Sequence, residues 1–357
     1  MPYQFYKMKI KMTLLFVSLF LVNQSTAFAY SFSSPKEYPI KWNNLIAENP
    51  SPLAKEFVRS AEIINKRLMH GNIPYPSKKI SLNWEKGYNH AEDKFVFMRK
   101  YGVDCTRLLR YLYINMLHLP YNSKFSTAPI ISKTFTHNNP ESMSQLKNFD
   151  QVPKTKQGFK PQTGDILAFP GHTIAVLDPE NCIAIQSSIW LCKKSEKGFC
   201  VDYDYGESAG VSIYHLASER FCKNGIWKGM DNNKLKFTIG WRHKAFNTWI
   251  LTLPKEAKPG ETILISGKNL ANKYIYFTGS KTPVKARQIK RSSIYLKDHQ
   301  IQTVKITVPN DATTGKLKVF WGTGKPSPEK TVESQAALNI LNRDNHLVSI
   351  HSETFVD

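Results

Sequence analysis

Cys105 is the residue of this chain with the clearest chemical potential, because it is the odd one among five cysteines. It stands in the run Gly102-Val103-Asp104-Cys105-Thr106-Arg107-Leu108. The other four cysteines gather between positions 182 and 222, and two disulfides among them would leave Cys105 as an unpaired thiol. An odd thiol in an otherwise oxidised protein is a candidate nucleophile.

The spacing of the other four cysteines does not fix their pairing. They are Cys182, Cys192, Cys200 and Cys222, and four cysteines allow three connectivities. A bond between Cys182 and Cys192 would close a hairpin, and one between Cys200 and Cys222 would hold the loop that follows. A zinc site needs close pairs such as Cys-x-x-Cys, which these spacings do not offer, so we expect no metal and no cofactor.

A helix is predicted to begin at or just after Cys105. Apolar residues recur on one stripe between Leu108 and Met116, and Pro120 follows. A thiol at a helix N-terminus lies at the positive end of the macrodipole, which lowers its pKa. The sequence therefore predicts a thiolate at neutral pH.

His172 and Gln186 are the predicted partners of this nucleophile. His172 follows the turn Pro170-Gly171 at the entrance of a predicted strand, and Gln186 ends the next apolar run. Adjacent antiparallel strands can bring the start of one beside the end of the next. A Cys105 thiolate would then attack an amide carbonyl, with its own backbone N–H helping to hold the oxyanion. His172 would protonate the leaving amine and activate water, while Gln186 fixes its tautomer.

Each of these residues also has an ordinary interpretation. Cys105 could be a small buried residue, His172 a surface histidine beside a turn, and Gln186 the point where a strand leaves the core. The three residues occur in the order cysteine, histidine, amide, and each has suitable local structure. Together they favour a catalytic role over the three ordinary ones.

The N-terminus predicts export. Three lysines between positions 7 and 11 precede the apolar run from Leu14 to Val22, and Ala27-Phe28-Ala29 is a small-x-small cleavage pattern. We interpret residues 1–29 as a signal peptide, since the apolar run is about half the length that a membrane span needs. The mature chain is expected to have no transmembrane segment and to be periplasmic or secreted.

The charge of the chain favours anionic partners. The formal net charge is +21, which attracts polyanions. An exported protein seldom meets nucleic acid, so peptidoglycan or another anionic envelope polymer is the expected partner. Solubility alone is the alternative explanation, because Lys and Arg are spread along the whole chain. The most concentrated basic stretch, between Lys281 and Lys297, is typical of a solvated face.

Helices are predicted first and strands afterwards, which is an α+β order. Ser51-Pro52 and an apolar stripe predict a helix over 52–69. Residues 121–163 are expected to be a long irregular loop with a short helix near 141–146. Strands are predicted at Asp165–Phe169, Thr173–Leu177, Ile183–Gln186, Val211–Leu216 and Phe237–Trp241.

From Trp249 onward the pattern is all-β and predicts a second domain, most simply a sandwich. Its strands are expected at Thr262–Ser266, Tyr274–Phe277, Thr303–Val308 and Leu317–Trp321. The predicted organisation is a signal peptide (1–29), a catalytic domain (30–246), a β-sandwich (250–342) and a polar tail (343–357).

The first domain resembles the papain-like NlpC-type cell-wall peptidases over about residues 85–215. The run around Cys105 is similar to the family's Asp-Cys-Ser-Gly motif. Gly164-Asp165-Ile166-Leu167-Ala168-Phe169, followed by Gly171-His172-Thr173-Ile174-Ala175-Val176, is similar to its linked Gly-Asp and Gly-His segments, and Gln186 falls where its third polar residue belongs. The C-terminal stretch resembles IPT/TIG-type immunoglobulin-like domains through residues 259–270 and 306–309.

The resemblance implies an exported cysteine hydrolase of peptidoglycan stem peptides with a Cys105, His172, Gln186 triad. It implies that Asp104 helps to hold a free substrate amine, and that a tyrosine, Tyr101 or Tyr88, assists the oxyanion. Thr106-Arg107 stands where the family keeps Ser-Gly, which places these two side chains near the substrate and leaves the scissile bond open. An amidase, deamidase or acyltransferase acting on a protein or lipid, or a non-catalytic envelope-binding or adhesion protein, are the alternatives. The sequence does not indicate an oligomeric state.

Overall fold

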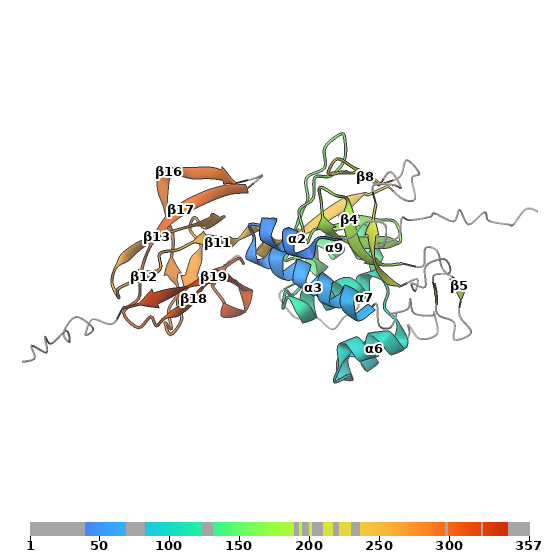
Figure 1. Ribbon diagram of the computed structural model, residues 1–357, viewed down its shortest axis with the longest axis horizontal. Helices are drawn as coiled ribbons and strands as arrows, with labels where there is room; N and C mark the ends of the chain where they lie inside the picture. Colours follow the sequence, from blue (N-terminus) through green and yellow to red (C-terminus); the bar gives the residue numbers. More distant parts are fainter. Residues whose placement is uncertain are drawn as a thin grey trace, which may run out of the picture. The chain divides into compact units, whose positions relative to one another are not determined.

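The structure is a computed structural model of the 357-residue chain (Figure 1). It describes residues 40–68, 83–122, 131–188, 193–194, 200–201, 210–216, 221–229, 236–296, 299–322 and 324–341. The predicted signal peptide, the predicted polar tail and Cys192 lie outside these residues.

Helices dominate the first part of the described chain. They are α2 (Trp42–Glu48), α3 (Pro52–Leu68), α5 (Trp84–His90), α6 (Lys94–Tyr101), α7 (Cys105–Arg110), the π-helical η1 (Tyr111–Met116), α8 (Ser132–Thr136) and α9 (Pro140–Gln145). The predicted helix over 52–69 is confirmed as α3, where the Ala54 N–H donates to Ser51 Oγ at 3.4 Å. Its predicted apolar stripe is buried, with Phe57 and Ala61 fully inaccessible.

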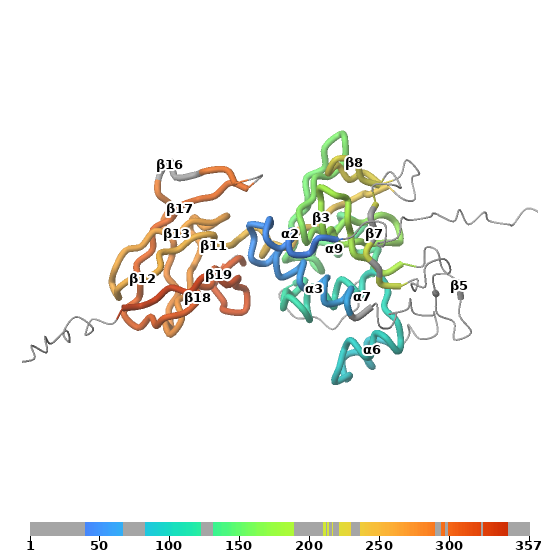
Figure 2. Tube along the Cα trace, viewed as in Figure 1, coloured from blue at the N-terminus to red at the C-terminus, as the bar shows by residue number. Residues whose placement is uncertain are grey.

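A six-stranded antiparallel sheet follows, in the order β1-β10-β2-β3-β4-β7. Its strands are β1 (Phe149–Gln151), β2 (Ile166–Phe169), β3 (His172–Asp178), β4 (Ile183–Ser187), β7 (Val211–His215) and β10 (Ile239–His243). The predicted strands over 165–169, 173–177 and 183–186 are confirmed as β2, β3 and β4, which pair antiparallel in chain order, but the later strand β10 pairs with the other edge of β2. Figure 2 shows the Cα trace of the chain, with α3, α7 and β3 labelled.

The stretch predicted to be a long loop, 121–163, is partly structured. It contains α8, α9 and the edge strand β1, which pairs with β10 through Phe149 and His243. Phe135 and Phe149 are buried from this stretch. The short helix predicted near 141–146 is confirmed as α9, whereas α8 and β1, which apolar residues isolated among polar ones anchor, were not predicted.

The cysteine pairing differs from both bonds suggested by sequence proximity. Cys182 is bonded to Cys222, which lies 40 positions later in the sequence, and their Cα atoms are 5.6 Å apart. The reason is the hairpin of β8 (Cys222–Lys223) and β9 (Ile226–Trp227), which returns Cys222 to the start of β4. Cys200 begins the short strand β6 (Cys200–Val201), which pairs with β5 (Lys193–Lys194).

The C-terminal part is β-rich, as the pattern from Trp249 onward predicted, and its described strands form two sheets. One has the order β11-β13-β17-β16 and the other β12-β19-β18-β14-β15. Their bounds are β11 (Trp249–Thr252), β12 (Glu256–Ala257), β13 (Thr262–Lys268), β14 (Tyr274–Tyr276), β15 (Val284–Lys285), β16 (Arg287–Leu296), β17 (His299–Thr307), β18 (Gly315–Phe320) and β19 (Thr331–Ile340), with the 3-10 turns η2 (Lys244–Asn247) and η3 (Pro328–Lys330). Burial alternates along β13, where Ile263 and Ile265 are buried and Leu264 is exposed.

Candidate active site

Cys105 is the first residue of α7, as predicted, and its side chain is almost inaccessible, at 4% exposed. Asp104 caps this helix, because its Oδ1 accepts hydrogen bonds from the Arg107 N–H at 2.8 Å and the Thr106 hydroxyl at 2.9 Å. Helix α7 packs on β3 and β4. The thiol lies against Thr173, the second residue of β3.

The predicted lowering of the Cys105 pKa is wrong. Burial raises the pKa of the thiol to about 12, and the carboxylate of Asp104 adds to this effect. The Thr173 hydroxyl and main chain and the Thr106 main chain act in the opposite direction without offsetting it. The thiol is therefore protonated at neutral pH, because desolvation of the buried thiol is the largest of these effects.

His172 and Gln186 are neighbours, as the strand order predicted. Nε2 of His172 and Oε1 of Gln186 are 2.6 Å apart, and both residues are buried. With Oε1 as the acceptor, Nε2 carries the imidazole proton and Nδ1 carries the lone pair. Burial lowers the pKa of His172 to about 4, although Gln186 and Asp104 act in the opposite direction. The imidazole is a neutral base at physiological pH.

Consecutive residues of β3 relate the thiol to the imidazole. Thr173 lies against the thiol of Cys105, and the ring centre of His172, one residue earlier, lies 5.2 Å from that of Phe169. The charge of Asp104 raises the pKa of both Cys105 and His172. Both groups thus lie within electrostatic range of the start of α7.

Nε2 of Gln186 is buried and meets no hydrogen-bond partner in the described part of the chain. The hydroxyl of Thr173 is also buried, and the group that it faces is the thiol of Cys105. A buried donor is costly unless something pairs with it, so the Gln186 amide can donate to a bound molecule. Thr173 was missed in the sequence, where the signal is a hydroxyl directly after the histidine in an otherwise apolar strand.

A second missed residue, Ser187, positions the segment before the candidate nucleophile. Its hydroxyl donates to the carbonyl of Val103 at 2.5 Å and joins β4 to the entrance of α7. Asp165 of the Gly164-Asp165 pair lies just before β2 and joins the start of this strand to β10. Asp165 is fully buried and accepts two hydrogen bonds from Arg242 of β10, at 2.8 and 2.6 Å.

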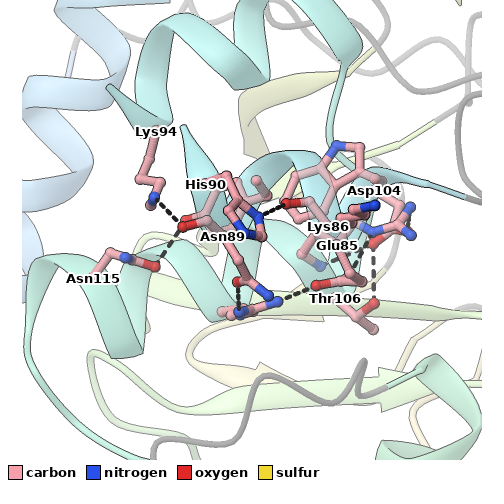
Figure 3. A network of polar contacts seen from close by, with 12 residues as sticks. Glu85, Lys86, Asn89, His90, Lys94, Asp104, Thr106 and Asn115 are labelled. Atoms are coloured by element: carbon pink, nitrogen blue, oxygen red, sulfur yellow. Dashed lines mark hydrogen bonds and ion pairs between the residues drawn. The ribbon is translucent and has the colours of Figure 1, made fainter. Parts of the chain in front are cut away.

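Arg107 and Arg110 join α7 to α5 through Glu85 (Figure 3). Arg107 Nε donates to Glu85 at 3.1 Å and Nη1 donates to Asp104 at 2.9 Å. Its guanidinium also lies 4.7 Å from the ring centre of Trp84. The charge of Arg107 is therefore balanced by carboxylates within the protein. A contact of Thr106 or Arg107 with a substrate stays a prediction.

Arg110 completes this cluster of Glu85, Asp104, Arg107 and Arg110, the acid–arginine cluster. It donates to the second oxygen of Glu85 and, at 2.8 Å, to Asn89. Its guanidinium lies 5.2 Å from the ring centre of Tyr88. The cluster fixes the helix that begins with the candidate nucleophile.

The two tyrosines considered for the oxyanion make other contacts. Tyr88 stacks on Trp84 with ring centres 4.4 Å apart, and its hydroxyl donates to Asn115 at 2.8 Å. Burial raises the pKa of Tyr88 well above its ordinary value. Tyr101 is partly buried, and its ring lies 4.6 Å from that of Phe97. An oxyanion role for either tyrosine stays a prediction.

His243 is a second buried histidine and has a structural role. Its Nδ1 accepts the Ala245 N–H at 3.2 Å, so Nε2 carries the proton and donates to the Pro120 carbonyl at 3.1 Å. Both nitrogens are thus bonded to backbone, whereas His172 is bonded to a side chain.

Comparison of the chain with protein-family models, with curated proteins and with solved structures gives no match. Among the described helices, none is long and apolar enough to cross a membrane.

Proposed function

We propose that the chain is an exported cysteine hydrolase that cleaves amide bonds of peptidoglycan stem peptides. The observation that supports this best is the buried thiol of Cys105 at a helix start, packed against the strand whose first residue is the Gln186-bonded base His172. The proposed catalytic domain, 30–246, is of the papain-like NlpC type, with helices packed on an antiparallel sheet. Localisation in the periplasm or outside the cell rests on the predicted signal peptide.

The proposed mechanism starts from a neutral thiol and a neutral imidazole. The Cys105 Sγ attacks the substrate carbonyl while its proton moves to His172 Nδ1, since the pKa shifts of both groups disfavour an ion pair in the resting protein. The backbone N–H of Cys105 and the hydroxyl of Thr173 are the candidate oxyanion donors. The imidazolium, held by Gln186, then protonates the leaving amine, and the neutral imidazole activates water to release the acyl group.

A second candidate is an amidase, deamidase or acyltransferase with the same residues and a protein or lipid substrate. The observation that favours it is the engagement of Asp104 by Arg107 at 2.9 Å. A carboxylate already paired in this way is a weaker site for the free substrate amine that stem peptides would present.

The C-terminal residues 250–342 are proposed to be an immunoglobulin-like sandwich of the IPT/TIG type. Its two sheets and the alternating burial along β13 support this. A spacer or targeting role follows only by analogy.

The function is tested by incubating the full chain with purified muropeptides and analysing the products by mass spectrometry. Cys105→Ala is expected to lower the rate by at least about 10³-fold, because the nucleophile is gone. His172→Ala should lower it about as much, whereas His243→Gln should retain activity in the fraction that folds. Intact muropeptides with the wild type would reject the cell-wall substrate.

Alkylation of Cys105 by iodoacetamide tests the protonation state independently of any substrate. Because its pKa is raised to about 12, we expect slow labelling at pH 7 and a rate that still rises above pH 9. Thr173→Val should slow labelling further, since the hydroxyl of Thr173 lowers the thiol pKa. Thr134→Val, which removes a buried hydroxyl on α8, is the control. A rate that levels off near pH 7 would contradict the neutral pair.

A further inference from the structure

Five lysines line one surface cavity of about 580 Å³ in the first part of the molecule. They are Lys154, Lys156, Lys223, Lys228 and Lys236. All five are exposed, and no carboxylate belongs to the described residues that line this lysine cavity. A concave surface with one sign of charge concentrates counter-ions.

The first wall of the lysine cavity is a tight turn over residues 154–159. Thr155 and Gly158 exchange backbone hydrogen bonds, and Lys154 pairs with Phe159 across the turn. Gly158 has φ +139°, and a Cβ there would lie 2.7 Å from the Trp227 carbonyl oxygen. Only glycine fits this close approach to β9, so the turn is held in place.

The second wall is the hairpin of β8 and β9. Asn224 and Gly225 have φ of 51° and 71°, which suits a two-residue turn of type I′. The disulfide from Cys222 to Cys182 ties the hairpin to the six-stranded sheet. Lys223 and Lys228 therefore project from a backbone whose position is fixed before any ligand arrives.

The lysines of the cavity have no ion-pair partner among the described residues. Lys154 donates to the Phe237 carbonyl at 3.0 Å, which directs its ammonium without neutralising it. Its pKa is lowered by burial and by the charge of Lys236. Glu180 comes close to Gly225 in the hairpin turn but does not line the cavity. Like charges are thus held together at a cost that an anionic ligand would remove.

The chemistry of the lining favours phosphate over other anions. A lysine ammonium is a compact point charge that binds phosphate. Each phosphate carries about one negative charge or more at pH 7, so two or three closely spaced phosphates offset much of the charge of the five lysines. Ile226 is the one apolar side chain among the described lining residues, and Phe159 and Trp227 beneath are buried. The cavity therefore offers neither a stacking surface for bases nor an apolar slot for acyl chains.

We propose that the lysine cavity is a binding site for a phosphate-rich polyanion, a group of two or three closely spaced phosphates. The cavity shares no residue with the Cys105 site, and binding there needs no turnover. The inference is therefore independent of the proposed hydrolysis.

The test is isothermal titration of the full chain with sodium tripolyphosphate at pH 7 and low salt. The pocket variant carries Lys156→Gln, Lys223→Gln, Lys228→Gln and Lys236→Gln, and keeps Lys154 because of its hydrogen bond. The control variant carries the same change at four exposed lysines of the C-terminal part, Lys255, Lys281, Lys285 and Lys305. Wild type and control should bind alike within about twofold, and the pocket variant at least about tenfold more weakly.

Three outcomes would overturn the proposal: equal losses in both variants, no binding by the wild type, or equal binding of citrate, which carries carboxylates only. The source of the phosphates is then assigned by two further arms. If the protein is retained on immobilised poly(glycerol phosphate) and tripolyphosphate releases it, the ligand is assigned as a phosphodiester polymer. Sedimentation with phosphatidylglycerol vesicles, competed in the same way, assigns a lipid head group, and failure of both arms rejects a macromolecular phosphate ligand.

Discussion

The acid–arginine cluster and the lysine cavity use positive charge in opposite ways. Arg107 and Arg110 are each 11% exposed, and both are paired with Glu85. Both also lie over aromatic rings of α5. The lysines of the cavity are exposed, and none is ion-paired in the part of the chain that the structure describes. In the acid–arginine cluster the cations hold α7 and α5 together. In the lysine cavity they remain available to bind an anionic partner.

The difference follows from the chemistry of the two side chains. A guanidinium is planar and weakly hydrated, so it can be buried between a carboxylate and an aromatic ring. An ammonium is strongly hydrated and stays at the surface. A net charge of +21 therefore says little by itself, because some of the cations belong to internal contacts and only the rest can attract a partner.

Glu85→Ala should have the largest effect on stability. It removes the carboxylate that two mostly buried guanidinium groups share. Arg107 keeps Asp104 as a partner, but Arg110 is left without an ion-pair partner among the described residues, and leaving such a charge uncompensated costs about 3 kcal/mol. We expect a lower free energy of unfolding in urea, followed by tryptophan fluorescence. The Cys105 thiol should also become easier to alkylate, because α7 loses its anchor to α5.

Glu56→Ala on α3 is the matched control. It removes an exposed ion pair with Arg59 at 3.1 Å, with both side chains about half exposed, which is worth at most about 0.5 kcal/mol. Similar losses for the two variants would mean that the acid–arginine cluster is no more than a surface ion pair.

Asp104→Ala should have an intermediate effect, about 1 to 2 kcal/mol, because it removes the cap of α7 and one ion-pair partner of Arg107. Asp93→Ala is the control for the cap alone, since Asp93 caps α6 through the Phe95 N–H at 2.7 Å and has no ion pair among the described residues. Asp104→Asn separates charge from capping, because asparagine also caps helices. It should lower the pKa of Cys105, since the carboxylate raises it, and so speed alkylation at pH 8. Slower alkylation would contradict the assigned electrostatics.

The regular elements were largely predictable from the sequence. The stripe from Leu53 to Leu68 and the runs that became β2, β3 and β4 carry their own periodicity, and Pro170-Gly171 marks the turn between two of them. The insertion of β10 beside β2 was not predictable, because strand order depends on long-range packing. The Cys182 to Cys222 bond was missed for the same reason, since proximity in sequence does not show where a hairpin returns.

Within the candidate site, the contact of His172 with Gln186 was predictable from the sequence, whereas the shift of the Cys105 pKa was not. The spacing and strand order of His172 and Gln186 predicted their contact. The shift of the Cys105 pKa was predicted with the wrong sign, because a helix start can be inferred from sequence whereas the burial that raises this pKa depends on the packing of α7 on β3. Glu85 was missed because its partners lie about twenty residues away.

The smallest expected effect is that of the four glutamine substitutions in the lysine cavity on stability. If these lysines are held for a ligand, removing four of them relieves repulsion, and the free energy of unfolding should stay the same or rise by at most about 0.5 kcal/mol at low salt. Salt should stabilise the wild type more than the variant, because screening relieves the same repulsion. Equilibrium urea unfolding at low and high NaCl measures both quantities. A loss of stability like that of Glu85→Ala would mean that these lysines serve internal contacts after all, and the contrast between the two regions would fail.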